Sequence, residues 1–79
     1  LHCLELTVTD EAKTAYLLSE QLHLQQFQLV APGQFRIYDS GVAPGKLIQT
    51  LSLNGAEVTS ISEHTETLED YFLKLTSEV

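Results

Sequence analysis

Short segments with alternating and helical hydrophobic periods follow one another along the whole chain, and turn residues separate them. Alternation places apolar residues on one face of a strand, whereas a period near 3.6 places them on one stripe of a helix. The chain has 79 residues, which suffices for one domain with a small core. The pattern therefore predicts a single α+β domain over residues 1–79.

The first part of the chain predicts a strand followed directly by a helix. Apolar and polar residues alternate over residues 2–8, as in a half-buried strand. Residues 9–11, Thr-Asp-Glu, supply an N-cap side chain and an acid for the first helical turn. The helix is expected to reach about Leu22. Its predicted apolar stripe consists of Ala12, Ala15, Leu18 and Leu22.

The next segment predicts a β-hairpin. Alternation over residues 27–31 and again over residues 35–39 indicates two strands, with Pro32 and Gly33 turning the chain between them. Pro-Gly fits the central positions of a type II turn, but primed turns match the twist of a hairpin better. The register of this hairpin therefore stays open.

A second helix, a fourth strand and a last helix follow. Pro44 suits a first helical turn, and the pair Asn54-Gly55 suits a helix end. The mixed spacing of Val58 and Ile61 within residues 56–62 predicts a strand with a bulge. A capping-box pattern at Thr67 predicts the last helix. The apolar stripes of the two helices are Leu47, Ile48 and Leu51, and Leu68, Phe72 and Leu75.

This order of elements predicts a ferredoxin-like βαββαβ fold with a four-stranded antiparallel sheet and an extra C-terminal helix. Right-handed crossovers put the first and third strands at the centre, with both crossover helices on one face. The face toward the helices is expected to carry Leu4, Leu6, Phe27, Leu29, Phe35 and Ile37. The opposite face is expected to carry Glu5, Thr7, Gln28, Arg36 and Tyr38, and to serve as a docking surface or as the seat of the last helix.

Charge and composition exclude several classes of function. Eleven acids against four bases give a net charge of −7, which repels nucleic acid and anionic lipid. No apolar run approaches the roughly 20 residues that a membrane-spanning helix needs. A single cysteine forms no internal disulfide and suits a reducing, cytosolic setting. The absence of methionine, even at the first position, predicts a piece excised from a longer chain.

No residue pattern predicts catalysis, a cofactor or a metal. Residues 41–46 resemble a phosphate-binding loop, but the two glycines are one residue too close and Leu47 replaces the magnesium-binding Ser or Thr; an ordinary capped helix start is expected. Cys3 has no adjacent base in the sequence, so a buried or half-buried thiol is expected. The scattered histidines share no metal-ligand spacing. They are His2, His23 and His64.

The C-terminal part resembles a known family. Residues 57–61, Glu-Val-Thr-Ser-Ile, and residues 67–76, Thr-Leu-Glu-Asp-Tyr-Phe-Leu-Lys-Leu-Thr, are similar to the tail of bacterial ABC transporter ATP-binding proteins of the drug, bacteriocin and antibiotic-resistance exporters. The match covers about twenty residues. None of the ATPase motifs of that family is present, so the resemblance implies a domain that follows the nucleotide-binding domain.

The resemblance implies a non-catalytic accessory or regulatory domain that acts through protein contacts. The expected partners are the nucleotide-binding domain of the same chain, a second ATPase subunit and the membrane subunit of the transporter. ATP and Mg²⁺ are expected only in the missing N-terminal part, and the location is cytoplasmic, at the inner face of the cell membrane. The residues expected to make protein contacts or to pack are Leu68, Tyr71, Phe72 and Leu75.

The alternative is a small-molecule sensor domain of the amino-acid-binding ferredoxin-like type. Such domains place a glycine-containing loop after the first strand, where the ligand's backbone enters. Residues 9–11 form a tight helix cap instead. The sequence therefore leans toward the accessory domain.

Overall fold

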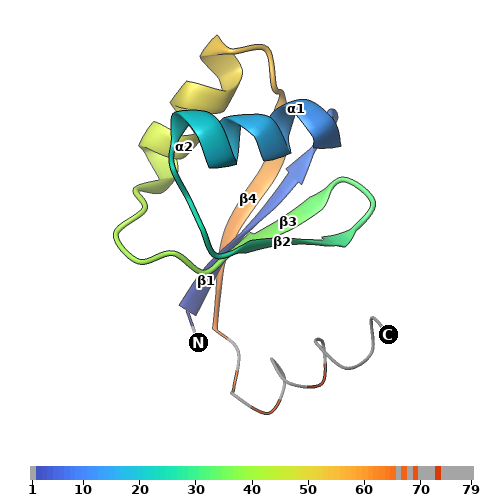
Figure 1. Cartoon of the computed structure of the whole chain (residues 1–79). Helices are drawn as coiled ribbons and strands as arrows, with labels where there is room; N and C mark the ends of the chain where they lie inside the picture. The colour runs from blue at the N-terminus through green and yellow to red at the C-terminus, as the bar shows by residue number, and fades with distance from the viewer. Residues whose placement is uncertain (1, 66, 68, 70–72, 74–79) are drawn as a thin grey trace.

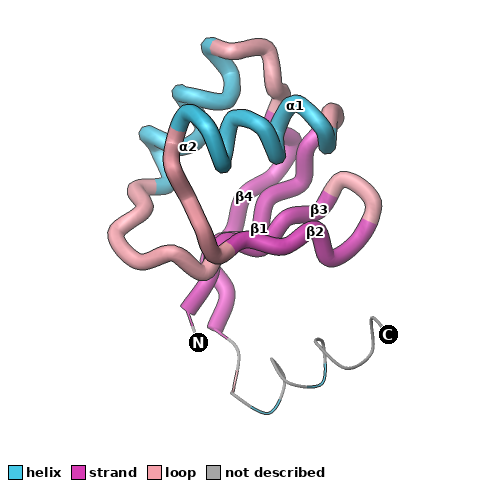
Figure 2. Tube along the Cα trace, viewed as in Figure 1, coloured by secondary structure: helices cyan, strands magenta, loops and turns pink. Residues whose placement is uncertain are grey.

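The computed structural model describes residues 2–65, together with residues 67, 69 and 73. These residues form a four-stranded sheet with its helices on one face (Figures 1 and 2). The predicted α+β class is confirmed, while the helix expected from Thr67 onward lies mostly outside the described residues. The elements are β1 (His2–Val8), α1 (Glu11–Tyr16), the π-helical η1 (Leu17–Gln21), β2 (Phe27–Ala31), β3 (Gln34–Ile37), α2 (Pro44–Leu53) and β4 (Val58–Thr65).

The strands lie in the order β2-β3-β1-β4, and all neighbours are antiparallel. The first and third strands therefore occupy the centre of the sheet, as the sequence predicts. The segment α1–η1 crosses from β1 to β2, and α2 crosses from β3 to β4 (Figure 1). This arrangement is compatible with the ferredoxin-like fold.

The core lies between the sheet and the helices. β1 contributes three inward side chains at alternate positions, and β3 contributes two, which is the alternation that the sequence shows. Phe27 and Phe35 add a tilted pair of rings whose centroids lie 6.2 Å apart, a favourable geometry for aromatic side chains. The buried residues of the core are Leu4, Leu6, Val8, Leu17, Leu18, Phe35, Ile37, Leu47, Leu51 and Ala56.

Two of the predicted core positions are wrong. Leu29 is 46% exposed, because β2 is an edge strand with a neighbouring strand on one side only. Ala12 is exposed, since it lies about 120° around the helix from Leu18. Leu18 is buried as predicted, and Thr14 and Leu17 are buried beside it.

The first crossover helix begins as predicted but ends differently. The carboxylate of Asp10 accepts a hydrogen bond from the backbone N–H of Lys13 at 3.0 Å, so Asp10 is the N-cap. The chain then widens into a π turn, in which the N–H of Leu22 bonds to the carbonyl of Leu17. His23 follows with φ of 54°, a left-handed conformation that costs a non-glycine residue roughly 1–2 kcal/mol. Periodicity alone does not reveal such a turn.

The second half agrees more closely with the sequence. Pro44 opens α2, Asn54 ends it, and Gly55 follows with φ of 83°. Strand β4 runs over residues 58–65 rather than the predicted 56–62, because its ladder continues along the whole of β1 to the pair His2–Thr65. The predicted bulge is confirmed, since the β1–β4 register shifts between Thr7 and Val8.

The hairpin turn is joined to both β1 and α1. Gly33 has φ of 72°, as the third position of a type II turn requires, and the β2–β3 register shifts between Leu29 and Ala31. The N–H of Val8 donates to the carbonyl of Gly33 at 2.7 Å. The N–H of Gly33 in turn donates to the carboxylate of Glu11. The hairpin turn therefore meets the end of β1 and the start of α1 at one glycine.

Replacing Gly33 by alanine should destabilise the fold. A Cβ at this position would lie 2.8 Å from the carbonyl oxygen of Val8, and the positive φ adds roughly 1–2 kcal/mol of strain. Gly45→Ala is the matched control, because nothing lies within 4 Å of its Cβ and alanine favours a helix by about 1 kcal/mol. In urea denaturation, the free energy of unfolding should fall for Gly33→Ala and rise for Gly45→Ala. Equal free energies of unfolding for the two variants would show that the contacts at Gly33 do not constrain this position.

Removing the hydroxyl of Thr14 should stabilise the fold. Thr14 is fully buried, and its Oγ1 has no hydrogen-bond partner among the described residues. Thr14→Val keeps the shape and removes the unsatisfied group, which should raise the free energy of unfolding by about 1 kcal/mol. Thr14→Ser keeps the hydroxyl, loses a methyl group and should lower it by about 1 kcal/mol. A destabilised Thr14→Val variant would show that the hydroxyl has a partner.

Candidate functional site

The loop that resembles a phosphate-binding loop borders a shallow hollow. Residues 40–43, between β3 and α2, form one wall, and Leu22 and Leu24 form the other. Lys46 and Leu47, from the first turns of α2, complete the lining of a cavity of about 220 Å³. Sequence patterns did not reveal this hollow, because its apolar wall comes from the end of the first crossover segment.

The start of α2 differs from the capped helix that the sequence predicts. Ala43 is the N-cap, and its side chain makes no capping hydrogen bond. The prediction of an ordinary capped start is therefore wrong in this respect, although Pro44 stands at the predicted place in the first turn. The loop holds neither the glycine spacing nor the hydroxyl that phosphate and magnesium binding need.

Asp39, just before the loop at residues 40–43, binds the connection between η1 and β2 through its carboxylate. Its two oxygens accept hydrogen bonds from the backbone N–H groups of Gln25 and Gln26, each at 2.9 Å. The N–H of Tyr38 also donates to the carbonyl of Gln26, at 2.7 Å. These bonds attach the connection before β2 to the end of β3. Asp39 therefore has a structural role.

The fold brings one cysteine and one histidine together. Cys3 on β1 and His64 on β4 are register partners, so the strand pairing supplies a neighbouring base that the sequence around Cys3 lacks. Residues opposite each other in an antiparallel pair have Cβ atoms about 5 Å apart. Cys3 is nevertheless only 1% exposed, and a thiol acts as a nucleophile where solvent and substrate reach it. The predicted buried thiol is confirmed.

The described residues show no cluster of three or more His, Cys, Asp and Glu side chains that could hold a metal ion. His2, His23 and His64 are all exposed, and they come from β1, from the end of the first crossover segment and from β4. Within the part of the chain that the structure describes, no helix is long and apolar enough to cross a membrane.

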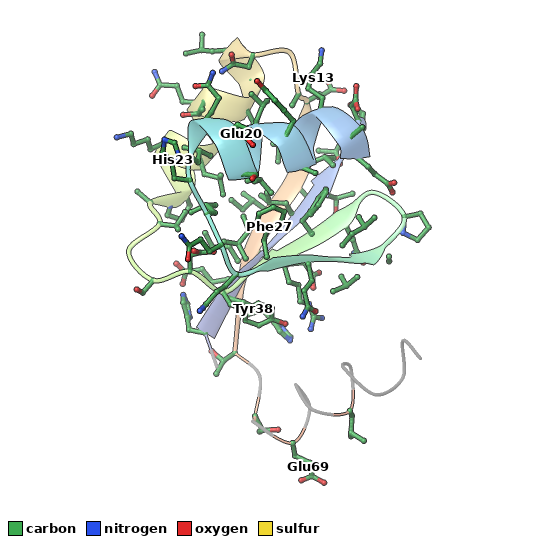
Figure 3. All side chains as sticks on the ribbon, viewed as in Figure 1. Lys13, Glu20, His23, Phe27, Tyr38 and Glu69 are labelled. Atoms are coloured by element: carbon green, nitrogen blue, oxygen red, sulfur yellow. The ribbon has the colours of Figure 1, made fainter. Side chains whose placement is uncertain are left out.

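The sheet face opposite the helices carries a polar pair. Glu5 on β1 and Arg36 on β3 are register partners, and Nε of Arg36 donates to Oε2 of Glu5 at 2.8 Å. Figure 3 shows Phe27 directed toward the helices and Tyr38 on the other side of the sheet. The predicted division into an apolar and a polar face is therefore present at the centre of the sheet.

The four residues predicted to make contacts or to pack, Leu68, Tyr71, Phe72 and Leu75, lie outside the described residues.

Curated relatives of this chain are ABC transporter ATP-binding proteins. The bacitracin transport ATP-binding protein BcrA of Enterococcus faecalis is 37% identical over 71 residues, which are 90% of this chain and 23% of that protein. BcrA of Bacillus licheniformis is 31% identical, and the uncharacterised ABC transporter ATP-binding protein YcbN of Bacillus subtilis is 28% identical, each over 72 residues. Both alignments cover 91% of this chain and 24% of the relative.

The chain therefore spans about a quarter of the length of these relatives and corresponds to a C-terminal piece of them. The resemblance that the sequence shows over residues 57–61 and 67–76 is confirmed, and it extends over nine-tenths of the chain. No protein-family profile matches the chain. No solved structure matches it either.

The pair formed by Glu5 and Arg36 should couple energetically. The side chains are 25% and 12% exposed, so water screens the pair only in part. A double-mutant cycle with Glu5→Gln and Arg36→Gln should give a coupling of about 1 kcal/mol by urea denaturation. Glu63→Gln is the control, since it neutralises an exposed acid on the neighbouring strand and should change stability by less than about 0.5 kcal/mol. A coupling energy of zero would show that the Glu5–Arg36 pair does not contribute to the stability of the fold.

Proposed function

We propose that this chain is a non-catalytic C-terminal accessory domain of an ABC transporter ATP-binding subunit and acts through protein contacts. The observation that carries the proposal is the alignment of 90% of the chain with less than a quarter of BcrA of Enterococcus faecalis. We propose that the aligned piece folds as a separate unit, and the core that the described residues enclose supports this. An accessory domain needs a core of its own and a place within a longer protein.

The residues of the site support a role without catalysis. The one thiol is buried, and the loop at residues 41–46 lacks the spacing of a phosphate-binding loop. Among the described residues, the histidines and acids form no metal-binding group. We propose that ATP and Mg²⁺ bind elsewhere in the longer protein and that this domain positions or regulates the part that binds them.

The proposed partners follow from the relatives. They are the nucleotide-binding domain of the same protein, a second ATPase subunit and the membrane subunit of the transporter. A domain with this role lies in the cytoplasm, next to the inner face of the membrane. Its net charge of −7 favours protein partners over nucleic acid and over the anionic lipid surface.

The geometry gives less support to a small-molecule sensor. The hollow beside Lys46 holds about 220 Å³, whereas ligand pockets usually hold about 300–1,000 Å³. The sensor domains of this fold admit a ligand at the connection from β1 to α1. Here that connection is occupied by the hydrogen bonds from the N–H of Lys13 to Asp10 and from the N–H of Gly33 to Glu11. The accessory role therefore fits the described residues better.

A domain exchange in a relative tests the proposal. BcrA of Enterococcus faecalis is shortened by the segment that matches this chain, and a second version carries this chain in its place. The shortened subunit should still hydrolyse ATP when purified, because the proposed domain supplies no catalytic group. It should fail to support bacitracin transport in cells, and the grafted chain should restore transport.

Two controls make the exchange decisive. A graft of the same chain with Gly33→Ala should restore bacitracin transport less well, because that variant is less stable. The isolated 79-residue chain should release no phosphate from Mg-ATP. Loss of ATP hydrolysis in a folded, shortened subunit would contradict the non-catalytic role. Full bacitracin transport without any graft would contradict the accessory role.

A further inference from the structure

Strand β4 forms an open edge of the sheet. The strand order places β2 and β4 at the two edges, and β4 pairs with β1 on one side only. Six of its eight residues are exposed, and the other two, Val58 and Ile61, are half-buried. No backbone hydrogen bond from the described residues reaches its outer side. An edge of this kind is a template on which a further strand pairs.

β4 lacks the features that usually protect a sheet edge. Protected edge strands are short, are interrupted by a bulge, or carry proline or lysine. β2 has such features, since it is five residues long, its register with β3 shifts, and Pro32 follows it. β4 has neither proline nor lysine, and its register with β1 is regular over residues 60–65. Of the two edges, β4 is therefore the one suited to pairing.

The hydrogen bonds of β1 show which backbone groups of β4 point away from the sheet. The N–H of Val8 donates toward β3, whereas the N–H of Thr9 donates toward β4, to the carbonyl of Glu57 at 3.2 Å. Since the direction alternates along a strand, the odd-numbered residues of β1 bond toward β4. Their partners on β4 are Ser60, Ser62 and His64. The outward N–H and C=O groups therefore belong to the residues between and after these, which are Ile61, Glu63 and Thr65.

The side chains beside the outward groups define the chemistry of a partner strand. Ile61 is opposite Leu6, and Glu63 is opposite Leu4, so both lie on the side of the sheet that faces the helices. A further strand places one residue beside each of them, and these two residues are two positions apart. An apolar side chain suits the place beside Ile61. Lysine or arginine suits the place beside Glu63, because opposite charges on paired strands attract.

Charge favours a basic partner over a second copy of this chain. Residues 54–65 contain two acids, Glu57 and Glu63, and neither lysine nor arginine. The whole chain carries a net charge of −7, so two copies repel each other. A positively charged segment is attracted by the same charges.

We propose that β4 pairs along its outer edge with an extended segment of the ATP-binding part, in which an apolar residue and a lysine or arginine stand two positions apart. The backbone of that segment bonds to Ile61, Glu63 and Thr65, and its basic side chain pairs with Glu63. In such strand addition, backbone bonds supply affinity and side chains supply specificity. The inference rests on the proposed function, because it names the surface through which the accessory domain makes its protein contact.

Amide exchange tests the backbone pairing, with the shortened BcrA of Enterococcus faecalis as the probe. The ¹⁵N-labelled 79-residue chain is measured alone and with a saturating amount of that subunit. Exchange at Ile61, Glu63 and Thr65 should slow by about tenfold or more, because their N–H groups then have partners. Phe27 and Leu29 are the control positions.

The control amides lie on the other edge of the sheet. The N–H of Tyr38 donates to the carbonyl of Gln26, so the alternation along β2 directs the N–H groups of Phe27 and Leu29 outward as well. Exchange at these two positions should stay within about twofold in the complex. A contact that only stabilises the whole fold would not separate the two edges.

A charge reversal tests the chemistry of the partner. Glu63→Lys should weaken binding of the shortened BcrA by about tenfold, because attraction across the paired strands becomes repulsion. Glu20→Lys is the matched control, since it makes the same change of charge at an exposed acid on η1. It should leave the affinity within about twofold.

The outcomes separate this inference from the proposed function. Saturable binding with unchanged exchange at the outward N–H groups of β4 would overturn the inference and leave the accessory function standing, and so would equal affinities of the two charge variants. Absence of binding would overturn both. Slowed exchange at these groups on raising the concentration of the chain alone would also overturn the inference, because the occupant would then be a second copy.

Discussion

The contacts at Gly33 hold three segments of this fold together. Val8 ends β1, Gly33 turns the hairpin and Glu11 opens α1, and two hydrogen bonds join them. The close approach requires a residue without a Cβ, since an added carbon would lie 2.8 Å from the carbonyl of Val8. The contacts set the hairpin against the first crossover helix, and the rest of the sheet follows from the position of β1 between β3 and β4.

Hydrophobic period was sufficient to predict the order of elements and the centre of the sheet. Alternation identified the inward residues of β1 and β3, because both strands are central and their two faces differ strongly. It failed for Leu29, whose exposure depends on the edge position of β2 rather than on its own neighbours. It also failed to show the π turn after Tyr16, since the apolar spacing there fits an α-helix equally well.

Sites were harder to predict than strands. The sequence placed Glu5 and Arg36 on the same face of the two central strands, but only the structure gives the register that pairs them. The pairing of Cys3 with His64 needs the longer ladder of β4, which the apolar spacing did not extend beyond Ser62. The strongest functional signal was the polar and apolar pattern of the C-terminal segment, and the relatives confirm that resemblance over most of the chain.

Direct contact between this domain and an ATP-binding domain is what the proposed function requires. The most direct measurement is a titration of the ¹⁵N-labelled 79-residue chain with the part of BcrA of Enterococcus faecalis that precedes the matching segment, followed by amide chemical shifts. Saturable shifts are predicted at exposed positions, with the buried positions of β1, such as Leu4 and Leu6, unchanged. An unchanged spectrum with the ATP-binding part, together with saturable shifts on addition of free amino acids, would contradict the accessory role and favour a sensor.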